Sequence, residues 1–292
     1  MEIAQEKTLM MNDILGKIML KASSFPSMPK AGVKLMDLLQ NKDVSIAEIE
    51  KILRYDPGLT ANVLKLANSS YFGIPSKVGS LKHAIALLGV KRFSQIVLTA
   101  CMSNTIDKAV EGYDLPPGEL WRHSIAVSKT AEALAKFVKL TNENDVFTPA
   151  LLHDMGKLLL GRFIKEGAQA IEDVVAGGVP LVVAENMIFG TDHAEIGAQI
   201  LAHWSFPGDI VNAVRLHHNP ERVKHSNGQT EIIYLSNILC NSHGDGDSIK
   251  GHDNSPSPVV LKRLNISFSQ YEIILERVCS WINELSDTLN FD

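Results

Sequence analysis

A histidine and an aspartate lie side by side in the segment LLHDMGKLLL, residues 151–160, which is otherwise mostly apolar. Lys157 follows about one helical turn after His153 and Asp154. Burying a polar group without a partner costs about 1–3 kcal/mol, so these side chains need either solvent or partners. The pair alone is a weak signal, because a second His-Asp pair occurs at 252–253. Its interpretation therefore depends on the rest of the chain.

Similar polar residues recur within apolar helical patterns in the second half of the sequence. Glu119 and His123 are four residues apart and share one face of an expected helix. The others are one histidine at the start of a helix, two at the end of another, and an asparagine within a third: His193, His217, His218 and Asn237. These groups would satisfy one another if they converged around a shared charge.

The chemistry of this set fits a metal site. Imidazole and carboxylate groups bind iron, manganese and zinc alike, and a carboxylate can bridge two ions. Five histidines together with Glu119 and Asp154 exceed the four ligands of one tetrahedral zinc ion. The set predicts one or two divalent transition-metal ions, and two such ions are the arrangement used in phosphoester hydrolysis. Lys157 would then contact a phosphate oxygen as a point charge.

Some of these residues also have an explanation at helix ends without any metal. The helix dipole favours Glu119 near a helix start, and it favours a cation such as His217 or His218 near a helix end. His193 could be a local residue of a helix start.

Asn237 and Lys157 have similar alternatives, since Asn237 could bond a neighbouring backbone and Lys157 could lie in solvent at a helix end. The remaining histidines of the second half are interpreted as incidental: His203, His225 and His243.

Composition limits the class of protein. The chain has 292 residues, 45% apolar and 21% charged, which is typical of a soluble globular protein. A net charge of −5 does not indicate the basic face that nucleic-acid binding needs. No uninterrupted apolar run approaches the roughly 18 residues of a membrane span, and the start lacks the order of a signal peptide. Three distant cysteines argue against disulfides. Together with the lack of a signal peptide, this leads us to expect a cytoplasmic protein. Cys101 lies in an apolar segment and is expected to be a core residue.

Helical periodicity dominates and strand signals are nearly absent, so we expect an all-α fold. In the first half, Ser45 with Glu48, Asp56 before Pro57, and Ser80 are candidate N-caps. Two short helices should meet at Gly89. In the second half, helices are expected over 118–140, 145–163, 180–189, 192–204, 207–218, 230–242 and 267–289.

The order of the polar residues resembles the HD superfamily of metal-dependent phosphohydrolases, with a His, then His-Asp, then a distal Asp. The longer pattern resembles the HD-GYP cyclic-dinucleotide phosphodiesterases. This resemblance implies metal ligands at Glu119, His123, His153, Asp154, His193, His217, His218 and Asn237. Asn237 replaces the family's Asp and brings no charge, and HHNPERVKH lacks the Gly-Tyr-Pro signature. Both departures argue against hydrolysis of a cyclic dinucleotide.

The first half resembles the HDOD family, HD-related output domains of bacterial signalling, through FPSMPKAGVKLMDLL, ILRYDPGLTANVLKLANSSYFG and LKHAIALLGVKRFSQIVL. The resemblance runs over about 20–240 and implies an HD-like helical bundle, 111–240, with an N-terminal helical half, 20–110. A Gly- and Pro-rich stretch near 112–118 supports that boundary. A polar segment, 241–258, reads as a mobile loop, and 259–292 as a C-terminal helical extension.

Two functions remain open at this level. The first is a bacterial signal-transduction or regulatory protein whose HD-type metal site is structural or sensory. The second is an active metal-dependent phosphohydrolase acting on a nucleotide or a related phosphoester. Iron is the favoured metal, with manganese and zinc as alternatives, and the expected partners are signalling proteins or a phosphorylated small molecule. A third interpretation takes Tyr71 and Phe72 as anchors of a docking surface, against the simpler one of core packing.

Overall fold

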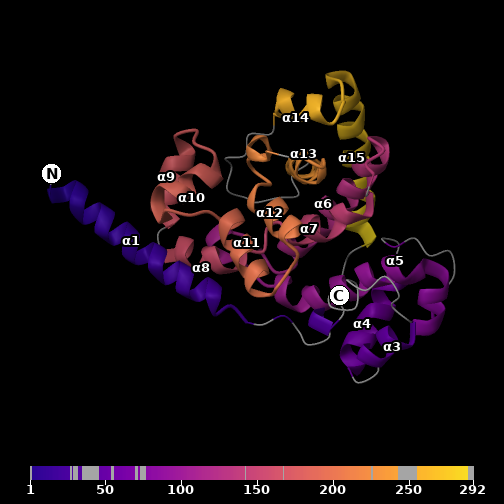
Figure 1. The fold of residues 1–292 in the computed structure, drawn as a ribbon. Coiled ribbons are helices and arrows are strands. Elements are labelled where there is room, and N and C mark those ends of the chain that lie inside the picture. The colour runs from indigo at the N-terminus through magenta and orange to yellow at the C-terminus, as the bar shows by residue number, and fades with distance from the viewer. Residues whose placement is uncertain are drawn as a thin grey trace. The chain divides into compact units, whose positions relative to one another are not determined.

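The computed structural model describes residues 2–26, 28, 32–34, 46–53, 56–69, 72, 77–141, 143–166, 168–224, 226–242 and 255–288. Within these ranges the regular structure is helical, and the one pairing of β type is an isolated bridge between Val110 and Leu115. The expected all-α fold is therefore confirmed (Figure 1). Three residues and one segment discussed above lie outside the described residues: Ser45, Tyr71, His225, and 243–254 of the polar loop.

The chain divides into two compact units. The first combines Met1–Phe25 with Asp107–Ile282, and the second combines Pro26–Ile106 with Asn283–Asp292. The described elements that lie wholly in the first unit are α1 (Glu2–Ser23), η1 (Glu111–Tyr113), α6 (Glu119–Phe137), η2 (Glu143–Val146), α7 (Phe147–Leu152), α8 (Lys157–Glu166), α9 (Ala168–Ala176), α10 (Leu181–Phe189), α11 (His193–His203), α12 (Gly208–Arg215), η3 (Pro220–Arg222), α13 (Gln229–Asn241) and α14 (Pro258–Arg263). α15 (Phe268–Thr288) belongs to the first unit up to Ile282 and to the second from Asn283.

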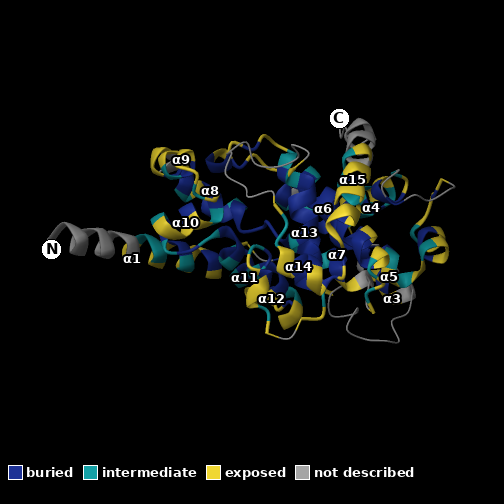
Figure 2. Ribbon diagram, turned by 90° about the horizontal axis from the view of Figure 1, so that it is seen from above, coloured by how far each residue is buried: buried dark blue, intermediate teal, exposed yellow. Residues whose placement is uncertain are grey.

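The centre of the first unit is formed by α6, α7 and α13, which Figure 2 shows buried over most of their length. α6 packs against both α7 and α13, while α12 packs against α11 and α7. α1 packs along α8, α10 and α11. Residues 20–25, which we expected in the N-terminal half, therefore belong to the first unit.

The single helix expected over 145–163 is wrong. α7 ends at Leu152, a turn covers residues 153–156, and α8 begins at Lys157. Gly156, the last residue of this turn, lies with its backbone against α11. A Cβ atom at this position would lie 1.9 Å from the carbonyl oxygen of His193. The His-Asp pair therefore lies in a tight turn between two helices, and not in the middle of one helix.

The second unit is built on α3 (Ile46–Leu53), α4 (Pro57–Ala67) and α5 (Leu81–Ile106), with α3 and α4 packed against α5. Asp56 caps α4 by accepting a hydrogen bond from the backbone N–H of Leu59 at 2.9 Å. Ser80 accepts one from the backbone of His83 at 3.2 Å. Gly89 has φ 74°, which interrupts α5 and confirms that two helices meet there.

Core positions of the second unit include two residues discussed above. Phe72 is 5% exposed, which favours core packing over a docking anchor. Cys101 is buried, and burial followed by the nearby charge of Asp56 raises the pKa of its thiol to about 12. All three cysteines are free. Cys101 is therefore a core residue, as predicted.

One segment, Leu81–Ser103, is long and apolar enough to be compared with a membrane span, with a mean hydropathy of 1.4. In the folded chain, however, 61% of this window is buried inside the protein. A core helix of a soluble protein passes the same test of length and composition. The segment is thus weak evidence for a membrane span, and its burial is that of a core helix.

Candidate metal centre

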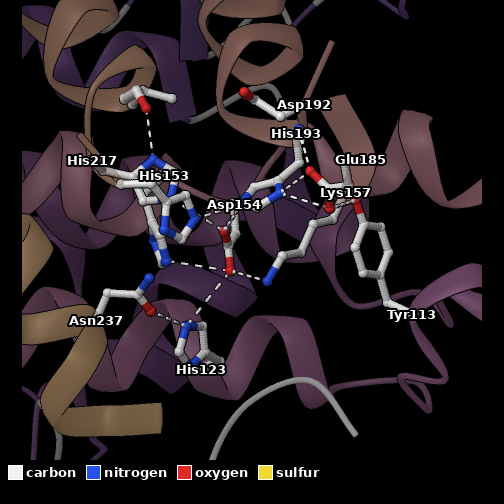
Figure 3. Close-up of polar contacts among 12 residues, drawn as sticks. Tyr113, His123, His153, Asp154, Lys157, Glu185, Asp192, His193, His217 and Asn237 are labelled. Atoms are coloured by element: carbon white, nitrogen blue, oxygen red, sulfur yellow. Dashed lines mark hydrogen bonds and ion pairs between the residues drawn. The ribbon is translucent and has the colours of Figure 1, made fainter. Parts of the chain in front are cut away.

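Five parts of the first unit bring polar side chains to one buried point (Figure 3). Each part contributes from a position that its local structure fixes. α6 supplies His123, the turn after α7 supplies His153 and Asp154, the first residue of α11 supplies His193, the segment after α12 supplies His217 and His218, and α13 supplies Asn237. The convergence expected from the sequence is therefore present for these seven residues.

Asp154 lies at the middle of this cluster and is 1% exposed. Its Oδ1 atom lies 3.3 Å from Nε2 of His193 and 3.7 Å from Nε2 of His217. Its Oδ2 atom lies 3.3 Å from Nε2 of His153 and 3.6 Å from Nε2 of His123. The two carboxylate oxygens therefore face two different sets of histidines.

Two groups of ligand atoms can be defined around this carboxylate. The four-residue group consists of Asp154, His193, His217 and His218, and the three-residue group consists of His123, His153 and Asp154. In each group the candidate ligand atoms lie within 4.8 Å of one another. Asp154 is common to both groups, so its carboxylate could contact an ion held by either group.

Asn237 borders the three-residue group. Its Oδ1 atom lies 3.0 Å from Nε2 of His123 and accepts a hydrogen bond from Nδ2 of Asn241 at 3.1 Å. The side chain is 5% exposed. Asn237 therefore directs its amide oxygen toward the three-residue group, and its side chain adds no charge there.

Three atoms at the centre of the cluster have no hydrogen-bond partner among the described residues. They are Nε2 of His153, Oδ1 of Asp154 and Nε2 of His217, and all three are buried. Leaving such atoms unpaired costs about 1–3 kcal/mol each. Imidazole nitrogen and carboxylate oxygen are donor atoms for divalent transition metals, so a cation would satisfy all three. The residues present therefore fit the metal that the resemblance implies.

The opposite ring nitrogens are held in place by hydrogen bonds. Nδ1 of His153 lies 2.8 Å from the carbonyl oxygen of Ala150, and Nδ1 of His217 lies 2.6 Å from that of Val214. A carbonyl can only accept, so each Nδ1 donates, and Nε2 is the ring nitrogen that faces the cluster. Such bonds commonly orient histidine ligands in metal sites.

Within the four-residue group, the pKa of Asp154 is lowered and that of His193 is raised. Burial alone would raise the pKa of Asp154, but the nearby charges of His153 and Lys157 hold that pKa well below its ordinary value. Burial alone would lower the pKa of His193, but the carboxylate of Glu185 and hydrogen bonds raise it to about 10. Asp154 is therefore anionic, and His193 carries a proton on each ring nitrogen when no metal is bound.

The adjacent histidines behave in the opposite way. Burial, and then the charge of His153, hold the pKa of His217 well below its ordinary value. Burial, and then the charge of His217, do the same for His218. Both imidazoles are therefore neutral at physiological pH, which is the state that binds a metal.

Lys157 is buried, which contradicts the alternative that it lies in solvent at a helix end. Its ammonium donates a hydrogen bond to Oδ2 of Asp154 at 2.7 Å, and the two side chains are 5% and 1% exposed. The ammonium also lies 5.6 Å from the centre of the Tyr113 ring, within the range of a cation–π interaction. Lys157 is therefore placed where a group bound beside Asp154 would meet a positive charge.

Glu119 differs from the other residues that the resemblance implies. It lies at the first residue of α6, and its carboxylate accepts hydrogen bonds from Nη2 of Arg122 at 2.6 and 2.5 Å. Within the described part of the chain, neither group of metal-ligand atoms includes it. The structure thus pairs Glu119 with Arg122 near the helix start, where the dipole also favours a carboxylate.

Two residues at the centre were missed by the sequence reasoning. Glu185, on α10, is completely buried, and its carboxylate contacts both the backbone and the ring of His193. Tyr113, in η1, is also completely buried and donates a hydrogen bond to Glu185 at 2.7 Å. The signal for Glu185 was present, because a lone carboxylate in the apolar segment LVVAENMIF must find partners. Nothing in the sequence near Tyr113 indicated its role.

Comparison with known proteins identifies the family. The family model described as the HDOD domain matches residues 25–220 of the chain. An uncharacterized protein of Treponema pallidum (strain Nichols) is 24% identical over 232 residues, which are 76% of this chain and 43% of that protein. The chain therefore spans less than half the length of this relative.

Solved structures show the same fold. An HDOD domain protein of Geobacter sulfurreducens matches with a TM-score of 0.74 and 24% identity, covering 94% of this chain and 98% of that one. A proposed phosphohydrolase of Shewanella amazonensis SB2B matches with a TM-score of 0.72 and 24% identity, covering 93% and 97%. A proposed signal transduction protein of Marinobacter aquaeolei VT8 matches with a TM-score of 0.75 and 18% identity, covering 95% and 64%.

Proposed function

Because the chain belongs to the HDOD family, we propose that it is a bacterial signal-transduction or regulatory protein with a retained HD-type metal centre. One or two divalent transition-metal ions occupy the centre, with the four-residue group on one side of Asp154 and the three-residue group on the other. The metal serves a structural or sensory role, and changes at the centre are read by a partner.

The observation that carries this proposal is the position of Asp154. Its two oxygens face separate sets of histidines, and Oδ1 has no hydrogen-bond partner among the described residues. Nε2 of His153 and of His217 are unpartnered in the same way. A cluster that only stabilised the fold would pair these atoms with one another or with backbone groups.

The donor atoms set the class of metal but leave its identity open. Imidazole nitrogens with one carboxylate suit iron, manganese and zinc. Iron is our first candidate, with manganese and zinc as alternatives. The proposed partners are signalling proteins or a phosphorylated small molecule, in the cytoplasm. The net charge of −5 does not favour nucleic acid as a partner.

Phosphoester hydrolysis is the second candidate function, and the position of Lys157 favours it. Two divalent ions, when bound, would activate water and neutralise the charge of a phosphoester. Lys157, buried beside Asp154, would contact a phosphate oxygen. Asn237 argues against this function, because its neutral amide stands where the related hydrolases have a carboxylate. An active enzyme would need the amide oxygen of Asn237 to complete the three-residue side.

Elemental analysis of the untagged protein, purified without chelators, tests the proposal. We expect one or two transition-metal ions per chain in the wild type, a near-complete loss in Asp154→Ala, and loss of the ion of the three-residue group in His153→Ala. The metal-loaded protein is then assayed against a panel of cyclic and linear phosphoesters. Metal without turnover supports the regulatory function, whereas turnover that Lys157→Met reduces supports the hydrolase. A folded wild type without metal contradicts both.

A further inference from the structure

A chain of three hydrogen-bonded residues approaches the four-residue group from its outer side (Figure 3). The hydroxyl of Tyr113 donates to Oε1 of Glu185 at 2.7 Å. Oε2 of Glu185 accepts the backbone N–H of His193 at 2.9 Å and lies 2.7 Å from Nδ1 of the same residue. All three side chains are at most 1% exposed. The contacts connect η1, α10 and the first residue of α11.

These contacts determine which nitrogen of His193 faces the metal position. A carboxylate has acceptor atoms only, so Nδ1 of His193 must carry the proton that it shares with Glu185. The other ring nitrogen, Nε2, then points to Oδ1 of Asp154 at 3.3 Å and to Nε2 of His218 at 2.9 Å. Glu185 thus holds His193 at its backbone N–H and at Nδ1 of its ring, with Nε2 directed into the group.

His193 differs in this respect from two other histidines of the centre. Nδ1 of His153 and of His217 are anchored on carbonyl oxygens three residues earlier in the chain. Those anchors are part of the local backbone and are independent of side-chain identity. The anchor of His193 is a charged side chain eight residues away, and hydrogen bonds to a charged acceptor are roughly twice as strong as neutral ones. Substitution can therefore weaken this anchor alone.

We propose that Glu185 is a positioning residue that fixes the ring and the tautomer of His193 for a metal ion in the four-residue group, and that Tyr113 fixes the carboxylate of Glu185. This inference rests on the proposed metal function and names the residues that control one side of it. Through its bond to Nδ1, the carboxylate also increases the basicity of Nε2 and so strengthens the bond of His193 to the ion. Among the described residues, the hydrogen bonds of Glu185 go to Tyr113 and His193 and not to His123 or His153, so its effect on an ion in the three-residue group should be smaller.

Glu185→Gln is a conservative way to test the role. Glutamine keeps the shape and can keep its carbonyl oxygen toward the N–H groups of His193. Its NH₂ group would face the hydroxyl of Tyr113, which can turn to accept. The substitution therefore removes the charge of the acceptor with little change in volume. Tyr113→Phe removes the bond that fixes the carboxylate and leaves the charge in place.

Glu231→Gln provides a matched control. Glu231 is also a completely buried glutamate of the first unit, and its carboxylate is bound by Arg263 at 3.0 Å. Its substitution removes the same charge from a buried position outside both ligand groups. The wild type and the three variants are titrated with Co²⁺ in the presence of a competing chelator. The exchangeable imidazole N–H resonances of the Co²⁺-loaded proteins are recorded by NMR, and His193→Ala identifies the resonance of His193.

We expect Glu185→Gln to weaken the binding of one Co²⁺ ion by about 10- to 100-fold and to shift the N–H resonance of His193. Tyr113→Phe should weaken the same ion by a smaller factor, and Glu231→Gln should leave binding and resonance unchanged. Unchanged Co²⁺ affinity and an unchanged resonance in Glu185→Gln would overturn the inference alone. If Glu185→Gln fails to fold, the same two readouts in Tyr113→Phe decide. A folded wild type that binds no Co²⁺ contradicts the proposed metal function itself.

Discussion

The residues on the two sides of Asp154 differ in type and in charge. The four-residue group has three histidines, one of them held by the carboxylate of Glu185. The three-residue group has two histidines, and its neighbour on α13 is the neutral amide of Asn237. Both sides share the same carboxylate, so they differ only in what surrounds it. If ions bind on both sides, we expect their affinities to be unequal, because the charge beyond the shared ligand differs.

The largest effect is expected at the shared residue. Asp154→Ala should remove metal from both groups. It should also destabilise the metal-free protein by about 3–5 kcal/mol, because the buried ammonium of Lys157 loses its counter-charge. Metal analysis and urea unfolding measure the two effects, and adding Lys157→Met should recover part of the lost stability. Asp173→Ala, at an exposed position of α9, is the control. Metal retained by Asp154→Ala would show that Asp154 is no common ligand.

A large effect of opposite sign is expected on the weaker side. Asn237→Asp places a carboxylate next to the three-residue group and should tighten the weaker ion by roughly tenfold, about 1.4 kcal/mol. Chelator competition measures the two affinities separately. Asn212→Asp adds the same charge at an exposed site of α12 and should change neither. If the tighter ion responds while the weaker one does not, the assignment of the two sides is reversed.

The pH dependence should also separate the two sides. The pKa of His193 is raised to about 10 in the metal-free protein, so at neutral pH a metal must displace a proton from Nε2. Affinity of the four-residue group should therefore rise with pH and level off only above about 10, with release of protons measurable in weakly buffered dye solution. The same raised pKa stabilises the metal-free fold below pH 6.5, and that contribution is lost as the pH passes through about 10. Binding without any proton release at pH 7 would contradict this assignment.

The smallest effect is expected at Glu119. Its carboxylate is paired with Arg122, so Glu119→Gln should leave the metal content unchanged and alter the free energy of unfolding by less than about 1 kcal/mol. Metal analysis and thermal unfolding are sufficient readouts. Loss of an ion in this variant would show that Glu119 leaves Arg122 and binds on the three-residue side, which would reduce the contrast between the two sides.

The sequence predicted the convergence on Asp154 better than the local structure that produces it. Polar residues in apolar helices, such as His123 and Asn237, had to meet because each alone would be costly to bury. The turn at 153–156 was mistaken for helix, because the close approach of Gly156 to His193 depends on two segments distant in sequence. The same holds for Tyr113 and Glu185, whose contact spans 72 positions. Helical spacing also placed Glu119 beside His123, but it could not reveal the competing bond to Arg122.

Anomalous X-ray diffraction from crystals of the metal-loaded protein tests the central claim most directly. Data collected at the absorption edges of iron, manganese and zinc would locate each ion and identify its element. We expect an anomalous peak on the side of the four-residue group, and a weaker one on the side of His123 and His153. Asp154 bound only by Lys157, with no peak on either side of it in metal-loaded crystals, would contradict the account.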